Sequence, residues 1–318
     1  MGQTPTHRHV HEAPVRASAE DVHRLLADED NWPRVFASFV HLENLGPEGG
    51  SEGGSDRIGM WGHYDGTIEH WVALRRIDQD ALRVEFQPES LPPALESMRR
   101  SWVVEPAADG GSTVRLEHEY RLKDPAAAEG VRAQVEEIAA SEVAAVREAA
   151  ELASLQPEAL VTVEDEVTVA APVATVFSAL YEAAEWPSYM EHVARADVFG
   201  GGEGHTHVLE VDTIERHGGI FTTRAARVGL PGAKIAYKQL LLPPLGASHH
   251  VQWLLSARDG ATVVRSVQTV VIKESGVAAV LGEGTGVAAA RPFVQNELSS
   301  KVRLIFDAVK HRLEQDAN

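Results

Sequence analysis

The sequence contains no cysteine. This absence excludes disulfide bonds, thiolate-ligated zinc, iron–sulfur clusters and thiol nucleophiles. Basic residues are also few, with 29 Lys and Arg against 47 Asp and Glu, so the formal net charge is −18. Such a charge disfavours nucleic acid and anionic membranes as partners, because both require a basic surface. An acidic protein partner remains compatible with it, provided that it docks on a local basic patch.

Long hydrophobic runs are missing as well. No stretch approaches the ~18 consecutive apolar residues of a membrane-spanning helix. The first ten residues, MGQTPTHRHV, lack the apolar core of a signal peptide. We therefore expect a cytoplasmic protein. Its 318 residues, at roughly 150 residues per domain, predict two domains.

The two halves of the chain repeat one pattern. A Trp-Pro pair begins at Trp32 and again at Trp186, 154 residues later. Trp102 and Trp253 each stand ten residues after the first proline of a Leu-Pro-Pro segment, and an Asp-Gly turn follows both. The matches keep their order while the offset drifts only from 154 to 150 residues. An ordered set of this kind indicates a duplicated domain.

Each copy has the same predicted order of elements. A strand, a short helix and the Trp-Pro turn precede a series of strands, and a long helix closes the copy, at 129–152 and again at 292–313. This order predicts an α+β fold, an antiparallel sheet with helices on one face. A sheet that curls round one long helix leaves a cavity in its middle. We place the domains at 1–153 and 159–318, with a short linker between them.

His118 is a candidate acid or base. The strand that contains it alternates, so Val114, Leu116, His118 and Tyr120 point inward while the charged residues between them face solvent. Histidine titrates near neutral pH, which suits proton transfer; the other interpretation is a hydrogen-bonded core residue. Gln268 occupies the same place in the second copy and is a poor proton carrier. The first copy is therefore expected to be better equipped for acid–base chemistry.

Arg75 and Arg227 occupy equivalent places in the two copies. If their strand face is the inner one, each arginine is expensive to bury unless it binds something. A carbonyl, an enolate or a carboxylate would suit it. A surface position is the competing interpretation.

The six tryptophans and the 15 histidines allow two further interpretations. The tryptophans fit either core packing or an aromatic lining for a flat ligand. No histidine pair, His205 with His207 or His249 with His250, has a third ligand at a telling spacing, so we expect no metal site. The dinucleotide, phosphate-loop and nucleophile-elbow motifs are absent too. A cofactor-free reaction or simple binding remains.

At these residues the sequence resembles the aromatase/cyclases of bacterial type II polyketide synthases, which belong to the START-like helix-grip superfamily. The resemblance covers both halves, as in the di-domain branch of that family. The matching stretches are the two Trp-Pro pairs, WVALR at 71–75, LEH at 116–118, IAYKQL at 235–240, and Trp102 and Trp253 before their acidic-Gly turns.

The resemblance implies a fold and an activity. Two helix-grip domains would bind a ketoreduced poly-β-ketone tethered to an acyl carrier protein. They would direct its first aldol closure, between carbons 7 and 12, and then dehydration to an aromatic ring, with no cofactor. The alternative is a non-catalytic START-like carrier of an apolar aromatic ligand; in a third reading one copy is catalytic and the other supports it.

The resemblance also assigns roles to residues. Arg75 and Arg227 match the pocket arginine of the family, and His118 matches an acid–base histidine. A pocket tyrosine of some members is Phe39 and Val193 here, so either Tyr64, Tyr189 or water replaces it or the role is absent. The implied substrate-binding residues are Trp32, Tyr64, Trp71, Trp102, Trp186, Tyr189, Trp253 and Gln268.

Overall fold

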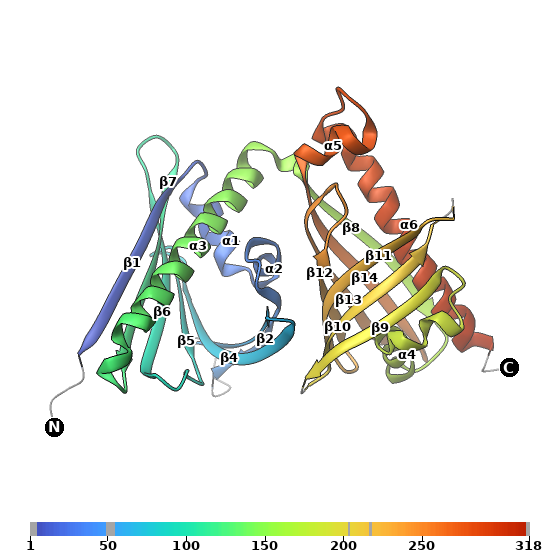
Figure 1. Ribbon diagram of the computed structural model, residues 1–318, viewed down its shortest axis with the longest axis horizontal. Coiled ribbons are helices and arrows are strands. Elements are labelled where there is room, and N and C mark those ends of the chain that lie inside the picture. The colour runs from blue at the N-terminus through green and yellow to red at the C-terminus, as the bar shows by residue number, and fades with distance from the viewer. Residues whose placement is uncertain (1–4, 49–54, 203, 216–217, 316–318) are drawn as a thin grey trace. The chain divides into compact units, whose positions relative to one another are not determined.

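The computed structural model describes residues 5–48, 55–202, 204–215 and 218–315. The chain divides into two compact units, and the main division along the sequence falls between Pro157 and Glu158. Over the described residues, each unit contains one seven-stranded sheet and one long helix (Figure 1). The predicted α+β architecture is confirmed: each sheet is antiparallel and curves around its helix in the helix-grip manner.

The first unit carries its strands in the order β1-β7-β6-β5-β4-β3-β2, so β1 crosses over to pair with β7 while the others form a meander. Its elements are β1 (Thr6–Val15), α1 (Ala19–Ala27), η1 (Glu29–Asn31), α2 (Trp32–Val35), β2 (Phe39–Pro47), β3 (Asp56–Tyr64), β4 (Thr67–Asp78), β5 (Arg83–Pro88), β6 (Leu95–Pro106), β7 (Ser112–Leu122), η3 (Pro125–Ala127) and α3 (Ala128–Leu155).

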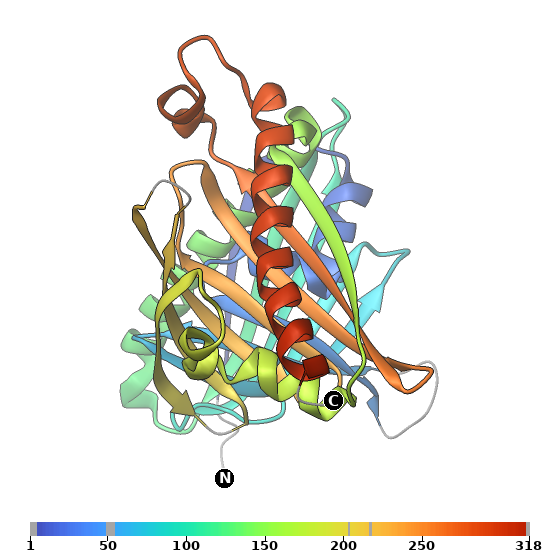
Figure 2. The same ribbon diagram turned by 90° about the vertical axis from the view of Figure 1, so that its right-hand side faces the viewer.

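The second unit repeats this order as β8-β14-β13-β12-β11-β10-β9. Figure 2 shows α6 lying across the face of that sheet. The elements are η4 (Pro157–Ala159), β8 (Leu160–Val169), α4 (Val173–Tyr181), η5 (Ala183–Ser188), β9 (Val193–Gly202), β10 (Thr206–Ile214), β11 (Ile220–Leu230), β12 (Lys234–Leu241), β13 (Gly246–Arg258), β14 (Ala261–Ile272), α5 (Glu274–Leu281) and α6 (Val287–Gln315).

Local sequence explains where several elements begin and turn. The Ser18 hydroxyl caps α1 by accepting a hydrogen bond from the Asp21 amide at 3.2 Å. Between β13 and β14, Asp259 and Gly260 have φ values of 51° and 81°, the left-handed region that an Asp-Gly hairpin turn requires. None of the described helices has the length and continuous apolarity needed to cross a bilayer.

Both long helices are longer than the apolar spacing predicted. The second, α6, begins at Val287, before the predicted start at Pro292. Proline lacks an N–H and so leaves the carbonyl four residues earlier without its helical partner. Pro292 and Ala288 both lie on the exposed side of α6, where water can satisfy that carbonyl.

Aromatic side chains fill the middle of the first unit. The Trp32 ring lies 4.8 Å from Phe36, 5.1 Å from Phe39 and 4.9 Å from Phe86, centroid to centroid. Trp102 and Trp71 extend the cluster through contacts with Phe36 and Phe39 at 6.0 and 5.8 Å. The equivalent core of the second unit is built from smaller or more polar side chains at four of these places: Met190 for Phe36, Val193 for Phe39, Thr223 for Trp71 and Tyr237 for Phe86.

This difference yields a stability prediction. Phe39→Val gives the first unit the residue of the second and leaves a hole between three aromatic rings. We expect the free energy of unfolding to fall by about 2–3 kcal/mol, as for other large-to-small core substitutions. Urea unfolding followed by circular dichroism measures it.

Phe293→Val is the matched control, because Phe293 is 40% exposed on α6. It should change stability by less than about 0.5 kcal/mol. Equal effects of the two substitutions would contradict the packing role of Phe39.

Candidate active site

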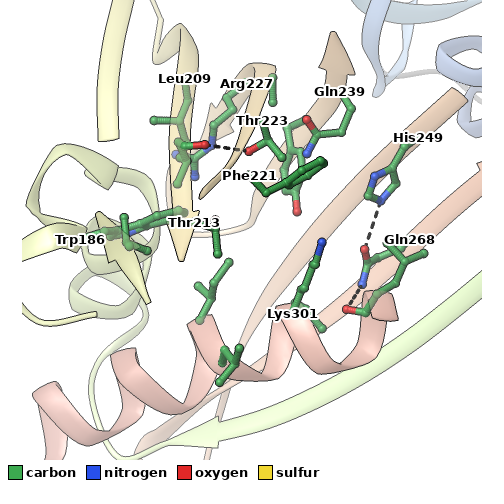
Figure 3. Close-up of a pocket in the computed structure, with 18 of the residues that line it drawn as sticks. Trp186, Leu209, Thr213, Phe221, Thr223, Arg227, Gln239, His249, Gln268 and Lys301 are labelled. Carbon is green, nitrogen blue, oxygen red and sulfur yellow. Dashed lines mark hydrogen bonds between the residues drawn. The ribbon is translucent and has the colours of Figure 1, made fainter. Parts of the chain in front are cut away.

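A cavity of about 140 Å³ lies in the second unit, between the inner face of its sheet and α6 (Figure 3). It has room for several water molecules. Its wall is mainly apolar and aromatic, with polar groups at a few places. The lining residues are Trp186, His192, Val193, Leu209, Val211, Thr213, Phe221, Thr223, Ala225, Arg227, Tyr237, Gln239, His249, Trp253, Gln268, Leu298, Lys301, Val302, Leu304 and Ile305.

Arg227 is the deepest charge in this wall, with an exposed fraction of 1%. Its guanidinium donates to the carbonyls of Leu180 at 2.8 Å and Tyr181 at 3.1 Å, at the C-terminal end of α4. The last carbonyls of a helix lack helical partners and carry partial negative charge, so they suit a cation. Nη1 of Arg227 also lies 3.4 Å from Nε2 of His207.

No carboxylate pairs with Arg227 anywhere in the described parts of the chain. Three rings surround its guanidinium instead: the ring centres of Tyr181, Trp186 and Trp253 lie 5.3, 5.5 and 5.8 Å from Cζ. Burial lowers the pKa of Arg227 to about 10, which leaves the group charged at neutral pH. The site therefore presents to an aromatic cavity a cation that has no carboxylate counterion among the described residues.

A second polar group lies on the other side of the cavity. Nε2 of His249 is 3.1 Å from Oε1 of Gln268, and the Gln268 amide nitrogen donates to the Leu298 carbonyl of α6 at 3.4 Å (Figure 3). Burial lowers the pKa of His249 to about 4, and the charge of Lys301 adds to this effect. The Lys301 ammonium itself lies 4.7 Å from the centre of the Phe221 ring.

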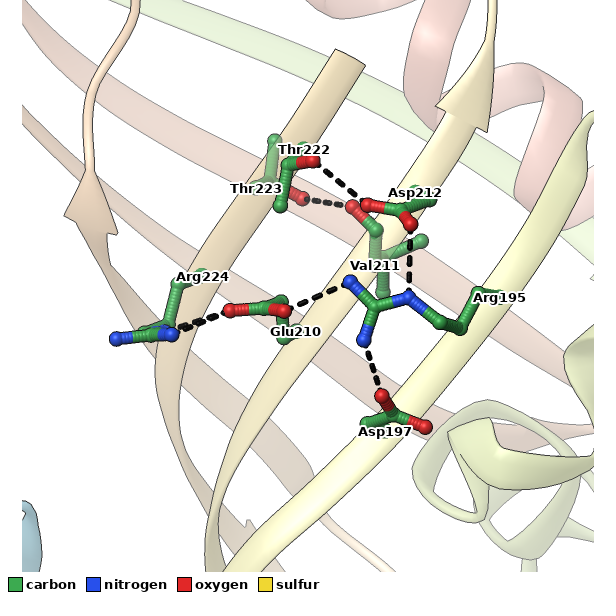
Figure 4. A network of polar contacts seen from close by, with 8 residues as sticks. All are labelled: Arg195, Asp197, Glu210, Val211, Asp212, Thr222, Thr223 and Arg224. Atoms are coloured by element: carbon green, nitrogen blue, oxygen red, sulfur yellow. Dashed lines mark hydrogen bonds and ion pairs between the residues drawn. The ribbon is translucent and has the colours of Figure 1, made fainter. Parts of the chain in front are cut away.

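A ladder of charges on the opposite face of the sheet holds these strands together. Arg195 of β9 bonds Glu210 and Asp212 of β10, both at 2.7 Å, and also contacts Asp197 (Figure 4). Arg224 of β11 joins the ladder through Glu210. Glu210 and Asp212 alternate along β10 with the cavity-lining residues Leu209, Val211 and Thr213. The ladder thus fixes the register of the strands that form the wall.

The equivalent arginine of the first unit has a different environment. Arg75 is buried as the inward interpretation expected, but it pairs with the carboxylates of Glu29 at 2.6 Å and Asp56 at 3.3 Å. It also donates to the Ala27 carbonyl at the end of α1. Two acidic partners neutralise this cation, so Arg75 and Arg227 have different electrostatic environments although they occupy equivalent places in the two copies.

His118 points inward, as the strand pattern predicts, and is 2% exposed. Burial lowers its pKa to about 3, with smaller contributions from Arg100 and His9. Arg100 lies opposite His118 on β6 and forms an ion pair with Glu142 of α3. His118 is therefore a neutral side chain beside a half-buried ion pair.

The other predicted residues divide into two groups. Trp186, Trp253 and Gln268 line the cavity with Arg227. Trp32, Trp71 and Trp102 belong to the aromatic cluster of the first unit, and Tyr64 is 39% exposed. Tyr189 is turned away from the cavity: its hydroxyl donates to the Ala179 carbonyl at 3.0 Å, and the Arg312 guanidinium lies 4.2 Å from its ring.

Several lining groups were not singled out by the sequence, among them His192, Tyr237, His249 and Lys301. The sequence points to His249 only as one half of the His249–His250 pair. Among the described residues, no group of three or more His, Asp and Glu side chains is arranged to hold a metal ion. Along β13, His249 and Val251 share a face with Trp253. This alternation predicts that the His249 side chain points inward.

Comparisons with known proteins agree with this architecture. A family model described as polyketide cyclase/dehydrase and lipid transport matches residues 6–151. The granaticin polyketide synthase bifunctional cyclase/dehydratase of Streptomyces violaceoruber is 30% identical over 93% of this chain and 91% of its own length. The actinorhodin polyketide synthase bifunctional cyclase/dehydratase of Streptomyces coelicolor is 31% identical over 95% and 96%.

Two solved structures match nearly the whole chain. The di-domain ARO/CYC BexL from the BE-7585A biosynthetic pathway has a TM-score of 0.89 and 33% identity, covering 97% of this chain and 99% of its own. The di-domain ARO/CYC StfQ from the steffimycin biosynthetic pathway has a TM-score of 0.84 and 32% identity over the same shares. The chain therefore belongs to the bifunctional polyketide cyclase/dehydratase enzymes. Within that class it is a member of the di-domain ARO/CYC family.

The lowered pKa of His118 leads to a prediction about acid stability. The unfolded chain binds a proton at this histidine below about pH 6.5, whereas the folded protein does so only near pH 3. Stability from this group is thus complete above pH 6.5 and falls as the pH drops toward 3. His118→Gln, the residue of the second unit, should reduce the loss of unfolding free energy between pH 7 and pH 4 by roughly 3 kcal/mol.

Urea unfolding at the two pH values measures this difference. His311→Gln, at an exposed position of α6, is the control and should leave the pH dependence as it is. A loss on acidification that is the same for His118→Gln and wild type would contradict the buried, neutral state of His118.

Proposed function

We propose that the cavity of the second unit binds a ketoreduced poly-β-ketone carried by an acyl carrier protein. In this proposal the enzyme directs the first aldol closure between carbons 7 and 12 and then the dehydration that makes the ring aromatic. The observation that carries the proposal is Arg227, a buried cation without a carboxylate partner in the described chain, on the wall of an aromatic cavity.

Aldol closure needs such a cation. Enolisation places negative charge on a ketone oxygen, and closure creates an alkoxide. Donors fixed in a site of low dielectric constant stabilise both charges strongly. A guanidinium has five N–H donors, and the bonds of Arg227 to described residues use three of them. The remaining donors are available to a substrate oxygen.

The apolar wall supplies the other requirement, which is to fold a flexible chain and keep water away. Trp186, Tyr237 and Trp253 give flat surfaces for the forming ring. Trp253 packs edge-on against Tyr237 and against Phe306 of α6, at 5.3 and 5.5 Å between ring centres. Rings fixed in this way limit the chain conformations that fit, and this limit selects which two carbons meet.

A tethered substrate accounts for the exposed end of the cavity. Lys301 and Leu304 line it from α6, yet Lys301 is exposed and Leu304 is 48% exposed. The wall is therefore open to solvent beside a positive charge. A negatively charged tether from an acidic carrier protein suits that opening, even though the whole chain carries a charge of −18.

This proposal reverses the expectation that the first unit is better equipped for acid–base chemistry. Its arginine, Arg75, is neutralised by Glu29 and Asp56, and aromatic rings occupy its middle. We assign Arg75 and His118 to the stability of a supporting unit. We assign the catalytic roles that were expected for Arg75 and His118 to groups in the cavity of the second unit.

Paired substitutions of the two equivalent arginines test the proposal. Arg227→Gln removes the cation that stabilises the enolate, and we expect the yield of the correctly closed first ring to fall about 10²–10³-fold, the effect of losing one oxyanion donor. Arg75→Gln should lower the melting temperature but keep the ring pattern. The measurement is product analysis by mass spectrometry and NMR after reconstitution with the synthase, ketoreductase and carrier protein.

Circular dichroism of each variant confirms that it is folded before its products are compared. Loss of the ring pattern in Arg75→Gln but not in Arg227→Gln would move the active site to the first unit. A ring pattern that is the same with and without the wild-type protein would leave only ligand carriage as its role.

A further inference from the structure

Within the proposed function, we propose that His249 is the group that accepts and returns the proton during dehydration, and that Gln268 is its positioning residue. His249 lines the same cavity as Arg227, on the opposite side (Figure 3). Neither the fold nor the arginine supplies a proton acceptor, so the cavity needs one from its remaining wall.

The backbone of α6 fixes the orientation of the Gln268 amide. The Leu298 carbonyl can only accept a hydrogen bond, so the group that faces it at 3.4 Å must be the amide NH₂ of Gln268. The carbonyl oxygen of the same side chain then faces His249. Because Oε1 is an acceptor, Nε2 of His249, 3.1 Å away, must carry the hydrogen.

This arrangement determines where a proton can be received. A neutral imidazole has one N–H and one bare nitrogen. With the hydrogen held on Nε2, the lone pair of His249 is on Nδ1, which has no hydrogen-bond partner among the described residues. The His249 side chain is partly accessible and lines the cavity.

The surroundings keep His249 in its proton-accepting form. Burial lowers its pKa to about 4 and the positive charge of Lys301 on α6 acts in the same direction, so the imidazole is neutral at pH 7. An enolate that forms at the Arg227 guanidinium adds negative charge to the cavity. That charge favours the imidazolium, so the basicity of His249 rises as the reaction proceeds.

The dehydration step then balances. Nδ1 of His249 takes the proton from the carbon next to the ketone, and the C–H electrons form the enolate held by Arg227. The enolate returns its electrons to form the carbon–carbon double bond, and the C–O bond to the hydroxyl breaks. The departing oxygen takes the proton from His249 and leaves as water, which restores the neutral imidazole.

The first unit supplies the substitution that tests this role. Met98 occupies the place of His249 in the repeated register, since β6 and β13 pair with β7 and β14 in the same way. His249→Met therefore keeps a side chain that this fold accepts at that position. We expect it to slow dehydration about 10²–10⁴-fold, the usual contribution of a positioned acid–base group, while ring closure keeps its pattern because Arg227 remains. The reconstituted synthase should accumulate the closed but still hydroxylated product.

Gln268→Leu tests the positioning role separately. It removes the acceptor for Nε2–H, so we expect a mixture of His249 tautomers and a smaller, roughly tenfold loss of dehydration rate, on the order of the one hydrogen bond removed. ¹⁵N NMR of the imidazole reports the tautomer directly and needs no substrate. In the wild type it should show the hydrogen on Nε2, and His311→Asn on exposed α6 should leave both measurements unchanged.

Two results would overturn the inference while the proposed function stands. The first is that Arg227→Gln loses the ring pattern while His249→Met dehydrates its product at the normal rate. The same conclusion would follow if His192→Asn, and not His249→Met, lost the dehydration activity. The other is a wild-type spectrum with the hydrogen on Nδ1, which remains decisive even if His249→Met does not fold. If the wild-type protein had no effect on the products, both the inference about His249 and the proposed function would be overturned.

Discussion

The second unit depends on one buried charge and on how it is held. Arg227 leaves water without meeting a carboxylate, and the end of α4 compensates it with two backbone carbonyls. Peptide dipoles give enough negative potential to keep a cation in place without cancelling its charge. The aromatic rings around it complete the cage, so the positive potential is directed into the cavity.

The first unit shows what happens when the same residue receives acidic partners. Glu29 and Asp56 turn Arg75 into a structural ion pair that joins η1 and β3 to β4. Larger rings then fill the space, as Phe39 and Trp71 do where the second unit has Val193 and Thr223. The duplication therefore preserves the fold while the interiors differ: the first unit has a packed aromatic core and the second has a lined cavity.

The sequence predicts the features that depend on local pattern. The Trp-Pro pairs, the order of the elements and the alternation of β7 are short-range signals, and they predict the repeat, the α+β fold and the inward His118. The alternation of β4 and β11 leaves open whether Arg75 and Arg227 face inward or toward solvent. The sequence does not predict which unit keeps an open cavity. That property depends on side-chain volumes summed over distant strands and on Glu29, which lies 46 residues from Arg75 in the chain. The orientation of His249 depends in the same way on a carbonyl of α6 that no spacing rule connects to it.

Because Arg227 is anchored to the last turn of α4, that helix determines where the guanidinium lies in the cavity. Leu180 and Tyr181 form the last turn of a nine-residue helix, and their carbonyls set how far the guanidinium projects. Gly229 keeps that turn close to the sheet, since a Cβ there would stand 2.7 Å from the Tyr181 ring. A change on the buried side of α4, at Phe177 for example, would shift the cation without altering any wall residue. The position of this cation in the cavity is thus set by a helix that contributes no residue to the cavity wall.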